Sequence, residues 1–455
     1  MHLRWCPAGS AWAMFFLNFS LYLFHNTARH WALSVVARIA VCMPLLLAGC
    51  GGGGGGSSNT AVVGASIPGD NVIPLTVDSG PAGAGPQANR LYTDVTLCQP
   101  GTSNCQTIHH VLVDTGSTGL RLIASQVSSA LHLQATTSPA TVACQQFLDG
   151  SFAWGPVVSA DVKLGGKTIP GLPLQMVGDA AYQATASTCA MGTAITSVVD
   201  VGLNPGLGAT GILGVGTSKE DCGAGCAGNP NNGYYFTCAG GCTGKALPRN
   251  QQLQNPVYVL SADNNGVVVV LPGLASGVLS APSLTGSMVF GIGTQANNTT
   301  TGASAMRLST STFSGYVVNT TVTRASYTAT MANSFLDTGS NGLYFGTASV
   351  TLPVCSTAPD FYCSTTGTTF FSATVSGSAG SARTFSFAVD PAVGGTNALF
   401  TSGDPVLPTL SGPSGDTSQF IWGLPFFYGR TVFIGFEGRS GVFNGSTVAG
   451  PYYAF

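Results

Sequence analysis

The sequence contains one ten-residue pattern twice, VDTGSTGLRL at Val113–Leu122 and LDTGSNGLYF at Leu336–Phe345. The two copies are identical at six of their ten positions, and an apolar run precedes each aspartate. A single Asp-Thr-Gly is commonly an ordinary turn, in which the aspartate caps its own backbone and glycine supplies a positive φ. Two copies with similar flanks indicate instead two related halves, each of which presents one aspartate.

The rest of the chain predicts β-structure. Helical periodicity is weak, whereas alternating β-branched residues bounded by Gly, Pro, Asn and Ser recur along the sequence. Tyr92–Leu97 alternates, Cys98–Cys105 is typical of a turn, and Ile108–Val113 is apolar enough for a buried strand that ends at Asp114. With 62 Gly, 25 Pro and 44% hydrophobic residues among 455, the chain has many turns and an ample core. We therefore expect an all-β, bilobal protein.

Charged residues are scarce and exclude several functions. The chain has 15 Lys+Arg and 17 Asp+Glu, or 7%, against about 25% in soluble domains. So few basic residues make nucleic acid an improbable partner. His109 and His110 are adjacent on a predicted strand and point to opposite faces, which disfavours a shared metal. We expect no metal ion and no cofactor.

The paired motifs resemble the active-site loops of pepsin-like aspartic peptidases, in which each of two β-rich lobes supplies one catalytic aspartate. That family also has a hydrophobic-hydrophobic-Gly element in each lobe, and Ile212–Gly214 and Ile421–Gly423 match it. Asn255–Leu260 and Gly286–Thr294 resemble the strands that link the lobes. The resemblance covers residues 65–455 and implies a bilobal pepsin-like fold with a cleft between an N-terminal lobe, 65–275, and a C-terminal lobe, 276–455.

The two aspartates suit peptide hydrolysis by water. One carboxylate deprotonates the water while the other carboxyl protonates the departing nitrogen, so Asp114 and Asp337 are the expected catalytic dyad. Two such groups in close contact cannot both ionise readily, and they titrate as a coupled pair. The expected partner and substrate is a peptide or protein.

The neighbours of each aspartate have predicted supporting roles. Gly116 and Gly339 permit a tight turn whose backbone N–H groups approach the carboxylates. Ser117 and Ser340 are placed to donate to the outer carboxylate oxygens. By resemblance, the threonines of the two motifs bond across the loops beneath the dyad, namely Thr115 and Thr338.

Two features depart from the family pattern. The tyrosine of the flap hairpin that closes over substrate is missing, and the matching region is 145–163, where Phe147, Phe152 or Trp154 are candidates to cover the cleft. Arg121 replaces the aromatic residue that often follows the first motif; it either shapes the pocket or is a solvated surface side chain. These departures leave open a catalytically inactive member that binds peptides or glycans, and a purely structural β-rich envelope protein.

The N-terminal segment, 1–49, is predicted to be a targeting signal. Arg38–Cys50 resembles a bacterial lipobox, which implies cleavage before Cys50 and lipidation of its thiol; a plain secretory signal or a membrane anchor is the alternative. Residues 50–64 form a Gly-rich tether. Gly51 lacks the aspartate associated with inner-membrane retention, so we expect the outer membrane. Residues 51–89 contain no Lys or Arg, which argues against a pepsin-type basic prosegment. A monomer is expected.

The remaining cysteines are even in number. Ten stay after Cys6, Cys42 and Cys50 are set aside, which suggests disulfides in an exported protein. The close pairs Cys98/Cys105 and Cys355/Cys363 are typical of loop staples. The alternative for four others is a structural zinc site, formed by Cys222, Cys226, Cys238 and Cys242.

Overall fold

The computed structural model describes residues 60–182, 189, 207–311, 315–346, 352–356, 358–363, 367–390 and 403–455. These residues fold almost entirely as β-strands, and the one α-helix among them is α1 (Ala224–Ala227). The fold class predicted from the sequence is therefore confirmed. The targeting segment 1–49 and the lipidation candidate Cys50 lie outside the described residues.

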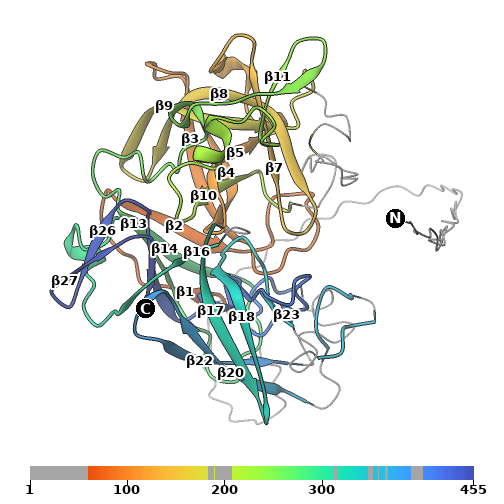
Figure 1. The fold of residues 1–455 in the computed structure, drawn as a ribbon, viewed down its shortest axis with the longest axis vertical. Helices are drawn as coiled ribbons and strands as arrows, with labels where there is room; N and C mark the ends of the chain where they lie inside the picture. The colour runs from red at the N-terminus through yellow and green to blue at the C-terminus, as the bar shows by residue number, and fades with distance from the viewer. Residues whose placement is uncertain are drawn as a thin grey trace, which may run out of the picture. The chain divides into compact units, whose positions relative to one another are not determined.

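The first half consists mainly of β-hairpins that surround the first motif. Figure 1 shows β3–β5 and β7–β11 gathered in one body. The longest hairpin joins β8 and β9, and its turn includes Gly165 with a φ of 57°, a backbone angle that glycine adopts without strain. The strands are β1 (Val62–Val63), β2 (Val72–Val77), β3 (Leu91–Cys98), β4 (Cys105–Asp114), β5 (Thr118–Ile123), β6 (Gln134–Ala135), β7 (Thr141–Gln146), β8 (Phe152–Leu164), β9 (Lys167–Val177), β10 (Gly211–Val215), β11 (Tyr235–Cys238) and β12 (Cys242–Gly244).

The second half has its own sheet, in which β17 and β18 form a long hairpin and β20 pairs with both β17 and β22. Along β20 the side chains alternate between buried and partly exposed, as expected for a strand with one face on the core. The strands are β13 (Gly266–Leu271), β14 (Leu284–Phe290), β15 (Ala305–Arg307), β16 (Ser309–Ser311), β17 (Gly315–Arg324), β18 (Tyr327–Leu336), β19 (Leu343–Tyr344), β20 (Thr369–Ser376), β21 (Ala379–Gly380), β22 (Arg383–Val389), β23 (Ser411–Gly412), β24 (Ile421–Trp422), β25 (Arg430–Gly435), β26 (Ser440–Phe443), β27 (Ser446–Ala449) and β28 (Tyr452–Ala454).

Short 3₁₀ turns connect some of these strands. They are η1 (Ala124–Gln126), η2 (Ser129–Leu131), η3 (Arg249–Gln251), η4 (Ala296–Asn298) and η5 (Leu424–Phe426). None of the helices in the described part of the chain is long and apolar enough to cross a membrane.

In each half, a short strand lies between the two strands that flank the motif and pairs with both. In the first half, β10 runs parallel to β4 and antiparallel to β5, with Gly214 beside Asp114. In the second half, β24 runs parallel to β18 and antiparallel to β19. The predicted hydrophobic-hydrophobic-Gly elements are therefore present in both halves and support the two motif loops.

A shared sheet connects the halves. Strand β14 pairs with β13, with β2 and with β1, and β13 pairs in turn with β25. The strand predicted at Gly286–Thr294 is confirmed in part, because β14 covers residues 286–290 and residues 291–294 form bends. The sheet also includes Val62 and Val63, which belong to the predicted tether but pair with β14. The predicted lobe boundary, 275/276, falls between two paired strands and stays a prediction.

The predicted linking strand at Asn255–Leu260 is wrong, because this segment forms turns. The carboxamide oxygen of Asn255 accepts hydrogen bonds from the backbone N–H groups of Val257 (3.0 Å) and Tyr258 (3.3 Å). Such a bond lets an asparagine side chain mimic a backbone turn, and it competes with strand pairing.

Among the described residues, five disulfides tie loops and hairpins within the halves. The two predicted staples, Cys98–Cys105 and Cys355–Cys363, are present. Cys222 is bonded to Cys226 and Cys238 to Cys242, so these cysteines offer no thiolates for the alternative zinc site. The fifth bridge, Cys144–Cys189, is anchored on β7.

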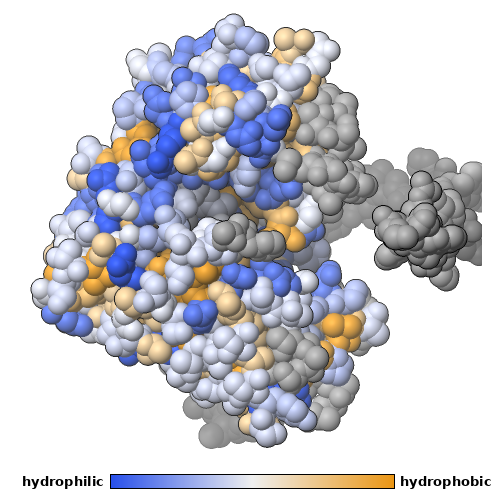
Figure 2. Space-filling view, in the orientation of Figure 1, coloured by the Kyte–Doolittle hydropathy of each residue, from blue (hydrophilic) through white to orange (hydrophobic). Residues whose placement is uncertain are grey.

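Apolar residues of both halves belong to one continuous core, which contains Leu213 behind the first motif and Trp422 behind the second. The surface is polar despite its few charges. Figure 2 shows that apolar side chains, in orange, occur in scattered groups among polar ones on the face in view. Ser, Thr and Asn thus supply much of the polarity that charged residues supply in other proteins.

Candidate active site

The two motif loops hold their aspartates in the same way. Asp114 ends β4 and Asp337 follows β18 directly. The Oδ1 atom of each aspartate accepts a hydrogen bond from the backbone N–H two residues later, at 2.8 Å from Gly116 and at 2.8 Å from Gly339. The loops therefore present their carboxylates in equivalent positions.

The serines donate to the other oxygen of each carboxylate. The Ser117 hydroxyl donates to Oδ2 of Asp114, and the Ser340 hydroxyl donates to Oδ2 of Asp337 at 2.6 Å. Hydrogen bonds to a charged carboxylate stabilise its ionised form. These contacts agree with the positions predicted for the two serines.

The threonines cross between the two loops. The Thr338 hydroxyl donates to the carbonyl of Val113 at 2.7 Å and accepts from the Thr115 N–H at 3.1 Å. The reciprocal pair is also present, because the Thr115 hydroxyl donates to the carbonyl of Leu336 at 3.2 Å and accepts from the Thr338 N–H at 3.0 Å. Both threonines are buried, so four hydrogen bonds fix one loop against the other.

The two glycines bring the carboxyl groups together. A Cβ atom added to Gly116 would lie 2.8 Å from the carboxyl carbon of Asp337, and one added to Gly339 would lie 2.8 Å from Oδ1 of Asp114. Each loop therefore approaches the opposite aspartate more closely than any side chain permits. The aspartates, 223 residues apart in sequence, belong to one site.

The pKa of Asp337 is raised. Loss of solvation raises the pKa of Asp337 above its usual range, and the nearby charge of Asp114 and the hydrogen bond between the two carboxyl groups raise it further. The bonds from Ser340 and Gly339 act in the opposite direction. Asp337 accordingly keeps its proton to a higher pH than an isolated aspartate does.

Both aspartates lie in a cavity of about 640 Å³. Its wall includes Phe147 and Phe152, two of the three cover candidates, and also Arg121. Phe147 lies in the turn between β7 and β8, where its N–H donates to the Ser151 carbonyl at 2.9 Å. The hairpin at the predicted flap position thus borders the cavity.

Trp154 does not line this cavity. Its side chain is 1% exposed, packs against Phe236 at 5.1 Å between ring centroids, and donates its indole N–H to the Tyr182 carbonyl at 2.7 Å. The ring fills a small core beneath the hairpin, and its only polar atom is already satisfied. Trp154 therefore packs within the small core of the hairpin. It does not lie over the cleft, contrary to the prediction from the sequence.

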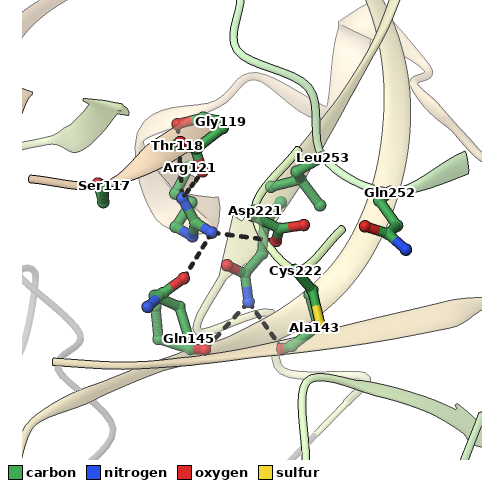
Figure 3. A network of polar contacts seen from close by, with 12 residues as sticks. Ser117, Thr118, Gly119, Arg121, Ala143, Gln145, Asp221, Cys222, Gln252 and Leu253 are labelled. Carbon is green, nitrogen blue, oxygen red and sulfur yellow. Dashed lines mark hydrogen bonds and ion pairs between the residues drawn. The ribbon is translucent and has the colours of Figure 1, made fainter. Parts of the chain in front are cut away.

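Arg121 is a buried network residue, not a solvated one (Figure 3). Its guanidinium donates to the Thr118 carbonyl at 2.7 Å and to the Gln145 side chain at 2.9 Å, and it pairs with Asp221 at 3.3 Å. The side chains of Arg121 and Asp221 are 1% and 2% exposed. Because Gln145 belongs to β7, the network connects the first motif to the hairpin beside the cavity.

Sequence reasoning missed the acidic partner of this network. Burial raises the pKa of Asp221 to about 6, although Arg121 and a hydrogen bond from the Tyr235 hydroxyl, at 2.6 Å, oppose the shift. Asp221 is 100 residues from Arg121, and nothing in its local sequence marks it. The one available signal is the scarcity of acidic residues, because each acidic residue in such a chain is more often there for a specific interaction.

Fold and site together define a two-lobed β protein that holds one aspartate from each half in a single cavity. Among the described residues, no group of three or more His, Cys, Asp and Glu side chains is placed to hold a metal ion. The carboxyl pair is therefore the chemically distinctive feature of this site.

A family model described as "Protein of unknown function (DUF3443)" matches residues 68–455, and the chain belongs to this family. A comparison with curated proteins gives no match. Among solved structures, the chain is similar to the aspartic proteinase from Irpex lacteus, with 16% identity and a TM-score of 0.44 over 84% of this chain and 96% of that one.

Proposed function

We propose that this protein is an aspartic endopeptidase in which Asp114 and Asp337 activate water for attack on a peptide bond. The observation that carries the proposal is the symmetric pair of loops, in which each carboxylate is bonded by the same glycine N–H and serine hydroxyl and approached by the glycine of the other loop. An ordinary pair of turns has no need for this mutual approach.

The proposed reaction divides the two roles between the carboxyls. Ionised Asp114 takes a proton from water as the water oxygen bonds to the carbonyl carbon, and protonated Asp337 gives its proton to the carbonyl oxygen. When the C–N bond breaks, Asp114 gives the proton that it took from water to the amide nitrogen, a hydroxyl of the tetrahedral intermediate returns a proton to Asp337 as its C=O bond forms, and the amine leaves. The raised pKa of Asp337 supports its role as the acid.

The cavity accounts for substrate binding in this proposal. An extended peptide lies between the loops and the β7–β8 hairpin, with backbone hydrogen bonds of the kind that sheet edges offer. Phe147 and Phe152 contribute apolar wall, while Arg121 and Gln145 keep the hairpin strand in place. The aromatic residues thereby substitute for the missing flap tyrosine in excluding water.

The proposed location is the bacterial envelope. Cleavage before Cys50 and lipidation of its thiol would anchor the protein, preferably at the outer membrane, with residues after the cysteine as a tether. Replacing Cys50 by Ser should move the protein from the membrane fraction to the soluble fraction in cell fractionation. Unchanged membrane association of that variant would contradict the anchor.

A peptide library tests the activity. The full-length protein is incubated with the library between about pH 3 and 8, a range that spans the ordinary and the raised carboxyl pKa values, and products are identified by mass spectrometry. We expect cleavage within peptides that stops when Asp114 or Asp337 is replaced by Asn. If folded protein cleaves no peptide, the peptidase proposal fails, and peptide or glycan binding without turnover would establish the non-catalytic alternative.

A further inference from the structure

Arg90 is held beside the cavity by a rigid anchor. The preceding residue, Asn89, is fully buried, with a φ of 50°. Its side-chain amide donates to the carbonyls of Leu407 (2.7 Å) and Asn341 (2.8 Å). Its oxygen accepts from the Leu407 N–H and the Tyr428 hydroxyl, both at 2.8 Å. These four bonds reach the second half of the chain, so the backbone at Arg90 has a fixed position.

The guanidinium of Arg90 lies against the second motif loop. One of its nitrogens donates to the carbonyl of Gly339 at 3.1 Å, and the residue is half-buried in the cavity wall. An arginine has five N–H donors in a planar fork. Among the residues that the structure describes, this carbonyl is the one hydrogen-bond partner of Arg90, and no carboxylate forms an ion pair with it.

Other charged side chains that line the cavity already have hydrogen-bond or ion-pair partners in the described part of the chain. Arg121 is paired with Asp221 inside the protein. Asp149, in the turn of the β7–β8 hairpin, accepts hydrogen bonds from the N–H (2.9 Å) and the hydroxyl (2.6 Å) of Ser151. In the proposed mechanism, the Asp114–Asp337 pair holds one proton and one negative charge. Within the described cavity wall, Arg90 is thus the cation whose donors remain available to a ligand.

We propose that Arg90 gives the site a preference for substrates that carry a carboxylate close to the scissile bond, on the side of the Asp337 loop. The carboxylate is an Asp or Glu side chain or the free C-terminus of the peptide. A planar guanidinium binds a carboxylate through two parallel hydrogen bonds, with matching charge and geometry. The inference rests on the proposed peptidase function and names its substrate class.

The charge balance of the cavity supports this preference. Without a nearby cation, the negative charge of the aspartate pair would repel an acidic substrate residue. Arg90 offsets that repulsion at the Gly339 side of the pair, whereas the Arg121 side chain is 1% exposed and donates to Thr118, Gln145 and Asp221 inside the protein. An uncharged polar residue such as Gln would gain hydrogen bonds there but no charge complementarity.

The test compares matched peptides within each protein variant. Peptides differ only by Glu or Gln at one position after another, and each is made with a free and with an amidated C-terminus. We expect kcat/KM for the wild type to favour Glu over Gln about tenfold at one position, the worth of a good charged hydrogen bond. If Glu and Gln peptides are cleaved equally well but amidation of the C-terminus lowers kcat/KM, the group bound is the C-terminal carboxylate.

The variants are Arg90→Ala, Arg90→Lys and Arg90→Glu, with Arg307→Ala, an exposed arginine outside the cavity, as the matched control. The preference should vanish in Arg90→Ala, persist in part in Arg90→Lys, reverse toward Lys-containing peptides in Arg90→Glu and remain in the control. Because each ratio is taken within one variant, a general loss of activity through the Gly339 contact cancels. A preference that survives Arg90→Ala, or that is absent from the wild type, overturns the inference.

A binding measurement separates this inference from the proposed function. Fluorescence anisotropy records how the Asp114→Asn variant, with and without Arg90→Ala, binds labelled Glu and Gln peptides. If the wild type cleaves no peptide while the Asp114→Asn variant shows an Arg90-dependent preference for Glu, the peptidase is refuted and the carboxylate site is kept. Cleavage with equal binding of both peptides would keep the peptidase and refute the carboxylate site.

Discussion

Asp337 occupies a position in which ionisation is unfavourable. It loses solvation in the cavity and has the carboxyl of Asp114 as its neighbour, and both effects raise its pKa. Below that raised pKa Asp337 is protonated and can act as the acid; above it Asp337 is ionised and the acid is lost. Activity should therefore fall on the alkaline side at a pH well above the ordinary carboxyl pKa of about 4.

The pH dependence of kcat/KM checks this expectation, and Ser340 provides a variant of known direction. The Ser340 hydroxyl stabilises ionised Asp337, so Ser340→Ala should move the alkaline limb to higher pH. An alkaline limb at the pKa of an ordinary carboxyl, or one that moves to lower pH in the variant, is inconsistent with Asp337 as the acid.

Gly116 in the first motif has no room for a side chain beside Asp337. Gly116→Ala places a Cβ 2.8 Å from both the carboxyl carbon and Oδ1 of Asp337, so the carboxyls must separate. We expect kcat to fall about a hundredfold, as it does for displaced catalytic groups. Gly225→Ala, where an added Cβ meets nothing within 4 Å, is the control. Equal activity of both variants would show that the close approach of the loops is dispensable.

At the scale of elements, the short strands β10 and β24 support the loops. A Cβ on Gly423 would lie 2.1 Å from the Gly342 carbonyl oxygen, although its φ of −72° suits any residue. Gly423→Ala should lower the free energy of unfolding by about 1–3 kcal/mol, the usual cost of overpacking. Gly415→Ala, which meets nothing within 4 Å, should change it little in denaturant titrations. Similar effects of the two substitutions would argue against the tight fit.

The elements also show what the sequence can and cannot predict. The motif loops and the short strands that support them were predictable, because each is marked by a short local sequence pattern. Leu213 and Gly214, for example, belong to such a pattern and pair directly with the strand that ends at the first motif. The strand predicted at Asn255–Leu260 is wrong, because the Asn255 side chain accepts a backbone hydrogen bond and turns the apolar segment. The Arg121–Asp221 pair and the Asn89 anchor were not predictable, because they join residues 100 to 339 positions apart without any local signal.

For the molecule as a whole, the two halves are joined by the sheet around β14 and by the four threonine hydrogen bonds. We expect calorimetry to show one cooperative unfolding transition for the two halves. Thr115→Val and Thr338→Val should show a coupling free energy of about 0.5–3 kcal/mol in a double-mutant cycle. Two separate transitions, or additive effects of the substitutions, would mean that the halves fold independently.

If Asp114 and Asp337 form one catalytic pair, both must be needed for turnover, which is measured as kcat for a cleaved peptide in wild type, Asp114→Asn and Asp337→Asn. Either substitution should lower kcat about a thousandfold, within the range for loss of general acid–base catalysis, with unfolding free energies that show intact folding. Asp94→Asn, an exposed aspartate, is the control. Retention of wild-type kcat by either motif variant would contradict the claim.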